Sequence, residues 1–140
     1  MNITIIDGQG GQLGAQLVKE ITSQFQNVKL TAIGTNSVAT ATMLKAGAKN
    51  AATGENSVVV ACRKADVIIG PIGIVITDSL LGEITDKMAI AVGRADAVRI
   101  LIPMNRCDNL IAGVPNLNTK TLIDDALVKL RGVINEKEFS

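Results

Sequence analysis

The 140-residue sequence contains no histidine, tyrosine or tryptophan, and only two phenylalanines. Without histidine, a Ser-His or Cys-His nucleophile and a histidine-ligated metal are excluded. With so few aromatic side chains there is no stacking surface for single-stranded nucleic acid. The formal net charge of +1 gives no sign of a basic surface for a duplex or an anionic membrane. We therefore expect no bound metal, and neither nucleic acid nor a membrane as partner.

Cysteines and long apolar runs are also scarce. Cys62 and Cys107 lie far apart in the sequence and form no C-x-x-C pair, which is typical of a reducing compartment. The longest uncharged apolar run, residues 67–77, is too short to span a bilayer. The first residues enter a strand pattern directly, without the features of a signal peptide. The sequence predicts a soluble, cytoplasmic protein.

Short apolar segments that alternate with amphipathic ones fill most of the chain. Apolar residues make up 47% of the sequence and charged residues 19%, as in a globular domain. Strands that alternate with helices predict a parallel sheet with helices on both faces and strand order 3-2-1-4-5. We expect one Rossmann-like nucleotide-binding domain over residues 1–135, built as a three-layer α/β sandwich. The predicted strands are residues 2–7, 28–33, 49–53, 67–70 and 98–102.

The end of the chain is expected to depart from this alternation. Only residues 103–109 separate the fifth strand from an apolar segment at 110–114. A parallel crossover needs about a dozen residues or more, so we expect a sixth, antiparallel strand at the sheet edge. An uncovered apolar edge strand would favour a homo-oligomer. A helix capped by Asn118 and a fraying polar tail, residues 136–140, are expected to follow.

A glycine-rich turn comes directly after the first strand. Its glycines are spaced G-x-x-G-x-x-G, and such a turn at a helix start offers unpaired N–H groups to a phosphate. We expect the backbone to approach the phosphate most closely at Gly11, and Gly14 to serve close packing of helix on strand. The alternative is a tight turn without a ligand. The predicted phosphate-binding residues are Gly8, Gln9, Gly10, Gly11, Gln12, Leu13 and Gly14.

Small and polar residues follow the other strands at the same edge of the predicted sheet. The segment after the second strand lacks the acidic residue that usually holds the ribose of NAD and an arginine for a 2′-phosphate. NAD, NADP and another nucleotide therefore remain open as cofactors. Asn36 could equally cap the next helix. The further residues predicted to line the site are Gly34, Thr35, Asn36, Gly70 and Arg106.

Three residues are candidates for catalysis, although they form no recognisable set. Asp7 lies where the first strand meets the turn, and it could act as an acid or base, bridge a metal, or bond the backbone of the turn. Cys107 beside Arg106 is either a reactive thiol or an inert loop cysteine. Asp78 is the third candidate. Cys62 falls on an apolar helix face and is expected to be buried.

Two resemblances accompany these patterns. The string I-I-D-G-Q-G-G-Q-L-G resembles the nucleotide-binding start of extended short-chain dehydrogenases and reductases, which implies an NAD(P)-type ligand. Those enzymes use a Tyr-x-x-x-Lys pair, and this chain has no tyrosine. Over its whole length the chain resembles a family of short bacterial Rossmann-like proteins of unassigned function, which implies the fold and no activity. The segments that carry this resemblance are G-T-N-S-V-A-T-A-T-M-L-K-A-G-A, G-P-I-G-I-V and L-I-P-M-N-R-C.

The sequence thus leaves three classes of function open. The first is a nucleotide or dinucleotide-binding protein that acts as a ligand sensor or regulatory subunit. The second is a small oxidoreductase-like enzyme acting on a phosphorylated or nucleotide substrate. The third is a structural interaction module, in which the glycine turn serves packing alone.

Overall fold

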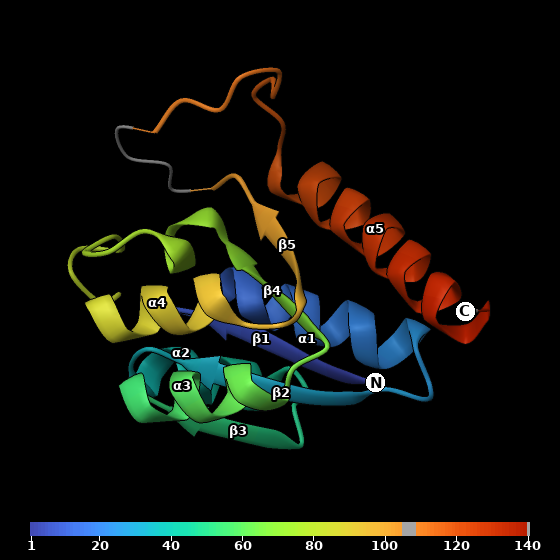
Figure 1. Ribbon diagram of the computed structural model, residues 1–140, viewed down its shortest axis with the longest axis horizontal. Coiled ribbons are helices and arrows are strands. Elements are labelled where there is room, and N and C mark those ends of the chain that lie inside the picture. The colour runs from blue at the N-terminus through green and yellow to red at the C-terminus, as the bar shows by residue number, and fades with distance from the viewer. Residues whose placement is uncertain (105–108, 140) are drawn as a thin grey trace.

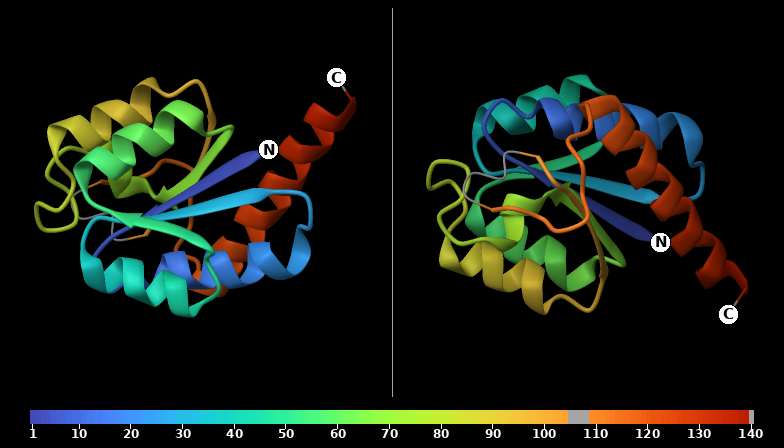
Figure 2. Two further views of the ribbon diagram at one scale, coloured as in Figure 1. Left: turned by 90° about the horizontal axis from the view of Figure 1, so that it is seen from below. Right: turned by 90° about the horizontal axis from the view of Figure 1, so that it is seen from above.

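A computed structural model describes residues 1–104 and 109–139 as a parallel five-stranded sheet between two layers of helices (Figures 1 and 2). The order β3-β2-β1-β4-β5 confirms the predicted α/β topology. The strands are β1 Asn2–Asp7, β2 Lys29–Gly34, β3 Asn50–Thr53, β4 Val67–Pro71 and β5 Val98–Ile102. The helices are α1 Gln12–Gln24, α2 Ser37–Lys45, α3 Glu55–Lys64, α4 Asp86–Arg94 and α5 Thr119–Phe139, with a 3-10 turn, η1, at Ile72–Val75.

Each face of the sheet carries its own apolar cluster. Helices α1, α2 and α5 cover one face and α3 and α4 cover the other (Figure 2). Because successive side chains of a strand point to opposite faces, β1 contributes Ile3 and Ile5 to the first cluster and Ile6 to the second. Cys62 lies in the second cluster with 4% of its surface exposed, as expected, and burial raises the pKa of its thiol to about 11.

Side-chain caps fix where three of the helices begin. The Asn36 Oδ1 atom accepts a hydrogen bond from the N–H of Ala39 at 2.8 Å and starts α2. Thr85 caps α4 through the N–H of Met88. Asn118 caps α5 in the same way, as its sequence position predicted. Within the described residues, no helix is both long enough and apolar enough to cross a bilayer.

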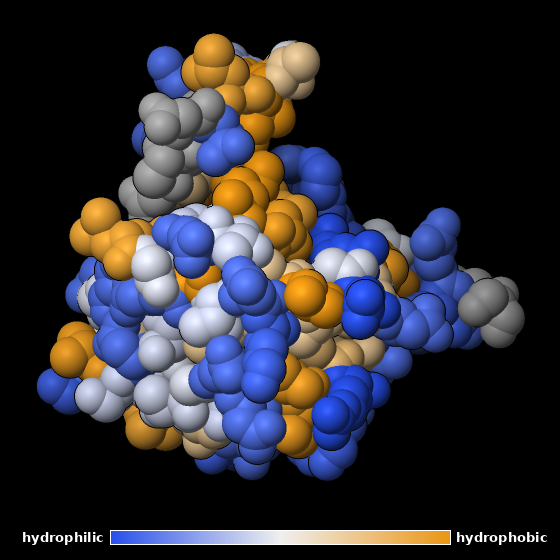
Figure 3. Space-filling model, turned by 60° about the vertical axis from the view of Figure 1, so that its left-hand side comes forward, coloured by the Kyte–Doolittle hydropathy of each residue, from blue (hydrophilic) through white to orange (hydrophobic). Residues whose placement is uncertain are grey.

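The end of the chain differs from the prediction in two respects. Residues 110–114 form no strand; they make a turn in which Gly113 adopts a φ of 78°. The predicted antiparallel sixth strand was wrong: the segment projects away from the sheet (Figure 1) and pairs with no strand among the described residues. The projecting part of the molecule nevertheless carries apolar side chains (Figure 3), and the apolar Leu110 is 95% exposed. The described edge of the sheet on this side is β5.

The polar tail was also misjudged. Helix α5 continues to Phe139, so residues 136–139 are helical and not frayed. Glutamate and lysine favour helices. The Lys137 ammonium in addition lies 3.5 Å from a carboxylate oxygen of Asp66, which ties the end of α5 to the loop before β4.

Candidate functional site

The carboxyl ends of the five strands meet at one rim of the sheet, and the glycine turn, residues 8–14, follows β1 there and includes the first residues of α1. The N–H of Gly11 donates to the carbonyl of Gly8 at 2.9 Å, which closes the turn. Gly11 has a φ of 76° and immediately precedes α1. This left-handed conformation is one that glycine adopts without steric cost.

Asp7 holds the turn together from inside. Its side chain is 6% exposed. One carboxylate oxygen accepts from the N–H of Gly8 at 2.8 Å and the other from the N–H of Gly14 at 2.7 Å. Burial raises the pKa of Asp7 above its ordinary value, while the two N–H groups act in the opposite direction and the charge of Glu83 adds to the rise. Of the roles considered from the sequence, this geometry matches hydrogen bonding to the turn backbone.

Three glycines of the turn are fixed by close packing. A Cβ atom at Gly14 would lie 2.9 Å from the Cβ of Asp7, as expected for a residue that packs helix on strand. A Cβ at Gly8 would lie 2.6 Å from the Oγ1 of Thr35. A Cβ at Gly11 would lie 2.7 Å from the Cα of Ala39 at the start of α2. Gly11 therefore permits close contact with α2, and the expected approach of a phosphate to Gly11 remains a prediction.

Gly10 is different from these three. No atom lies within 4 Å of the position that its Cβ would occupy, and its φ is outside the left-handed region. In the part of the chain that the structure describes, no acceptor meets the N–H groups of Gly10, Gln12 or Leu13. Unpaired N–H groups at a helix start, together with the positive end of the helix dipole, favour an anion. These three N–H groups are therefore the donors of the turn that have no protein acceptor among the described residues.

A carboxylate that the sequence did not predict lies beside the turn. Glu83 comes from the segment between η1 and α4, and its Oε2 atom accepts from the N–H of Gln9 at 2.9 Å. Its Oε1 atom accepts from the Oγ1 of Thr35 at 3.1 Å and from the Nδ2 of Asn36. Thr35 and Asn36 directly follow β2. Glu83 thus brings an acidic group to the end of β2, where the local sequence is neutral.

The segment that presents Glu83 has an unusual backbone. Asp78, Leu80 and Leu81 have φ values of 65°, 55° and 57°, although none is glycine. Such conformations cost about 1–3 kcal/mol each and tend to occur at functional sites. Leu80 is buried and would contact a Cβ at Gly8, so the segment rests on the glycine turn.

Asp78, a candidate for catalysis, belongs to this segment and is exposed. Its backbone N–H donates to the carbonyl of Ile84 at 2.8 Å, and its carbonyl accepts from the N–H of Gly82. Among the described residues, no hydrogen bond joins its carboxylate to the glycine turn. The structure therefore brings Glu83, and not Asp78, to the predicted site.

The remaining predicted residues have mixed positions. Gly34 and Gly70 are buried at strand ends, where a Cβ would meet the backbone N of Thr40 at 2.5 Å and the carbonyl oxygen of Ile6, respectively. They allow close packing beneath the rim. Arg106 and Cys107 lie outside the described residues. Little in the sequence indicated that Glu83 belongs to the site. The segment from η1 to α4 has no periodic pattern that would show which of its residues contacts the glycine turn.

This fold and site define a Rossmann-like α/β protein with a glycine turn at the carboxyl rim. The chain belongs to the family described as a domain of unknown function, DUF3842, which matches residues 2–135. The match agrees with the resemblance to short Rossmann-like proteins of unassigned function. No curated protein matches the sequence.

One solved structure of similar fold is a dodecameric FMN-dependent Ubix-like decarboxylase from Escherichia coli O157:H7. It has a TM-score of 0.47 and 13% sequence identity, over 93% of this chain and 94% of that chain.

Proposed function

We propose that this protein binds a nucleotide through the glycine turn, with a phosphate on the N–H groups of Gly10, Gln12 and Leu13. The observation that supports the proposal is that only some of the backbone N–H donors in the turn have acceptors within the described part of the protein. The N–H groups of Gly8, Gln9, Gly11 and Gly14 are bonded to protein acceptors, whereas the other three are not, within the described residues. The space above Gly10 is open. A phosphate oxygen is the kind of acceptor that such a helix start favours.

The ribose of the ligand would lie toward the end of β2, against Glu83, Thr35 and Asn36. A carboxylate accepts hydrogen bonds from ribose hydroxyls, and it repels a phosphate at the 2′ position. Glu83 has its bonds to Gln9, Thr35 and Asn36 on two oxygens that together offer about four acceptor sites. We therefore propose a ligand with free ribose hydroxyls: NAD in preference to NADP, or an adenine mononucleotide.

We propose a binding role, as a ligand sensor or regulatory subunit. The support is that both carboxylates beside the turn, Asp7 and Glu83, already accept hydrogen bonds from protein groups. The alternative, a small oxidoreductase-like enzyme, predicts oxidation of NADH or NADPH by the purified protein with carbonyl substrates. Turnover above about one per second in that assay would favour the enzyme.

A structural turn without a ligand is the second candidate. A specific observation favours it: the Cβ positions at Gly8, Gly11 and Gly14 are all blocked by neighbouring atoms. Packing alone therefore explains the spacing G-x-x-G-x-x-G. It does not explain Gly10, whose Cβ position is free, and this glycine separates the two candidates.

The test is a titration of the purified protein with AMP, NAD, NADP, FMN and inorganic phosphate, followed by calorimetry and thermal shift. We expect AMP and NAD to stabilise the protein, by about 2.7 kcal/mol at a hundredfold excess over Kd. NADP should bind at least tenfold more weakly than NAD, a difference of about 1.4 kcal/mol. The Glu83→Gln variant should reduce this difference, and Glu138→Gln, an exposed change at the far end of α5, should leave it unaltered. Absence of stabilisation by every nucleotide would refute the proposal.

A further inference from the structure

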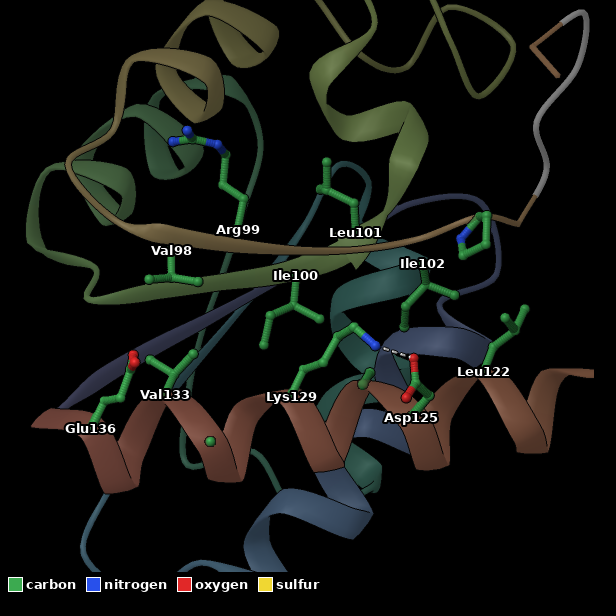
Figure 4. A pocket seen from close by; sticks show the side chains of 13 residues that line it. Val98, Arg99, Ile100, Leu101, Ile102, Leu122, Asp125, Lys129, Val133 and Glu136 are labelled. Carbon is green, nitrogen blue, oxygen red and sulfur yellow. Dashed lines mark hydrogen bonds and ion pairs between the residues drawn. The ribbon is translucent and has the colours of Figure 1, made fainter. Parts of the chain in front are cut away.

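Within residues 1–104 and 109–139, no strand pairs with the outer edge of β5. Residues 98–103 line a groove of about 720 Å³ whose opposite wall is α5 (Figure 4). Side chains of Val98, Ile100 and Ile102 point from the strand toward α5, whereas Arg99 and Leu101 point to the other face (Figure 4). Val98 is 42% exposed although it is apolar, whereas Ile100 and Ile102 are buried, with 6% and 2% of their surfaces exposed. The groove therefore joins one exposed apolar side chain to the edge of the strand.

The direction of the backbone groups follows from one hydrogen bond. The N–H of Val98 donates inward, to the carbonyl of Asp66 at 3.0 Å. Backbone groups alternate along a parallel strand, so Ile100 and Ile102 also bond toward β4. The N–H and C=O groups of Arg99 and Leu101 then point outward, and no backbone or side-chain partner meets them in the part of the chain that the structure describes.

Edge strands are usually protected from pairing by charged side chains, and β5 lacks this protection. Arg99 is the charged residue of the strand, and its guanidinium donates to the carbonyl of Ala95 at 2.9 Å, at the end of α4. Figure 4 shows this side chain turned away from the groove. As far as the described residues go, this edge is therefore able to accept another strand.

We propose that two copies of this chain pair through β5 as antiparallel strands, with Ile100 opposite Ile100 of the second copy. Arg99 is then opposite Leu101 of the second copy, and the outward backbone groups form two reciprocal pairs of N–H···O=C bonds. Other registers are less favourable. Arg99 opposite Arg99 sets like charges against each other. Leu101 opposite Leu101 brings Pro103, which has no N–H, opposite Arg99.

Side chains in the groove complement this pairing. On the α5 side, Val98 of one copy comes beside Ile102 of the other, so that pairing gives the exposed Val98 an apolar neighbour. The two-fold axis exchanges the two ends of the groove. Figure 4 shows Glu136 near the Val98 end, whereas the Lys129 side chain extends toward the Ile102 end, where its ammonium is paired with Asp125. Glu136 of one copy therefore approaches the Lys129–Asp125 ion pair of the other.

Sedimentation velocity of wild-type and variant proteins tests the surface. Val98→Lys places a charge in the groove and should weaken dimerisation at least tenfold, because lysine on an edge strand opposes pairing. Val128→Lys is the matched control, since Val128 is 67% exposed and does not line the groove. A monomeric wild type, or a Val98→Lys variant that associates as strongly as Val128→Lys, would overturn the proposal.

Disulfide formation tests the register. A non-hydrogen-bonded antiparallel pair has Cα atoms about 4.5 Å apart, within the range of a disulfide. In a Cys107→Ser background with buried Cys62 retained, Ile100→Cys should form a covalent dimer under mild oxidation. Val98→Cys should not, because four residues separate it from the position it faces. A covalent dimer from Val98→Cys, or none from Ile100→Cys, would contradict the register.

Discussion

The glycine turn has two sides that differ in what surrounds them. On the packed side, Cβ positions at Gly8, Gly11 and Gly14 are filled by Thr35, by the backbone of α2, and by Asp7. On the open side, Gly10 has free space above it. The difference shows that the regular spacing in the sequence marks the residues needed for packing. The glycine for which we propose a role in binding, Gly10, is the one that this spacing leaves out.

The largest expected effect is that of Gly11→Val on stability. A branched side chain there meets the Cα and carbonyl oxygen of Ala39, each 2.7 Å from the Cβ position, in a left-handed backbone conformation. We expect a loss of about 3 kcal/mol or more in the free energy of unfolding, because both strain and overpacking oppose the native turn. Denaturant unfolding measures this loss. A variant with wild-type stability would show that the packed side can adapt.

Asp7→Asn should have the next largest effect. An amide cannot accept from the N–H groups of Gly8 and Gly14 with both of its ends, so one donor loses its partner. We expect a loss of about 1–3 kcal/mol in unfolding free energy. The change is measured by the same denaturant series at neutral pH. An equal midpoint for both proteins would mean that Asp7 does not hold the turn.

The pH dependence of the stability difference between wild type and Asp7→Asn tests the raised pKa of Asp7. The pKa of Asp7 is raised in the folded protein, so the folded state retains a proton that the unfolded state releases. The unfolding free energy contributed by Asp7 therefore falls as pH rises from its ordinary value of 3.8 through the folded pKa. The slope is at most about 1.4 kcal/mol per pH unit. The stability difference between wild type and Asp7→Asn should shrink with rising pH over this window, and a growing difference would contradict the shift.

Glu83→Ala should loosen the segment that covers the turn without unfolding the domain. The change removes the acceptor of Gln9, Thr35 and Asn36 at a partly exposed position. We expect a loss of about 1–2 kcal/mol. Hydrogen exchange should accelerate in residues 78–84, whose left-handed conformations are then less well supported. Unchanged exchange there would show that Glu83 does not anchor the segment.

The smallest expected effect on stability is that of Gly10→Val. Since no atom lies within 4 Å of the Cβ position, the added side chain extends into free space. The unfolding free energy should change by no more than about 1 kcal/mol, as for most exposed substitutions. A loss as large as that of Gly11→Val would remove the distinction between the two sides.

Local patterns in the sequence predicted most of the fold. The apolar segments that become β1, β4 and β5, and the cap at Asn118, depend on neighbouring residues alone. The apolar segment 110–114 was misjudged because strand formation also needs a partner strand. Without the predicted sixth strand, β5 is the edge strand of the described sheet. The expectation of a homo-oligomer therefore now depends on the edge of β5.

The candidate site was less predictable because it depends on distant contacts. Which of Gly10 and Gly11 has free space at its Cβ position is decided by where α2 places Ala39. The acidic group beside β2 comes from Glu83, almost fifty residues later, as its bond to Thr35 shows. Neither relation leaves a periodic pattern in the sequence.

The most direct test of nucleotide binding at the open side is a calorimetric titration of AMP and NAD into wild type and Gly10→Val. We predict that the wild type binds, and that Gly10→Val loses at least tenfold in affinity, or about 1.4 kcal/mol, with an unchanged denaturation midpoint. Binding by Gly10→Val at wild-type strength would contradict the account, as would a wild type that binds neither nucleotide.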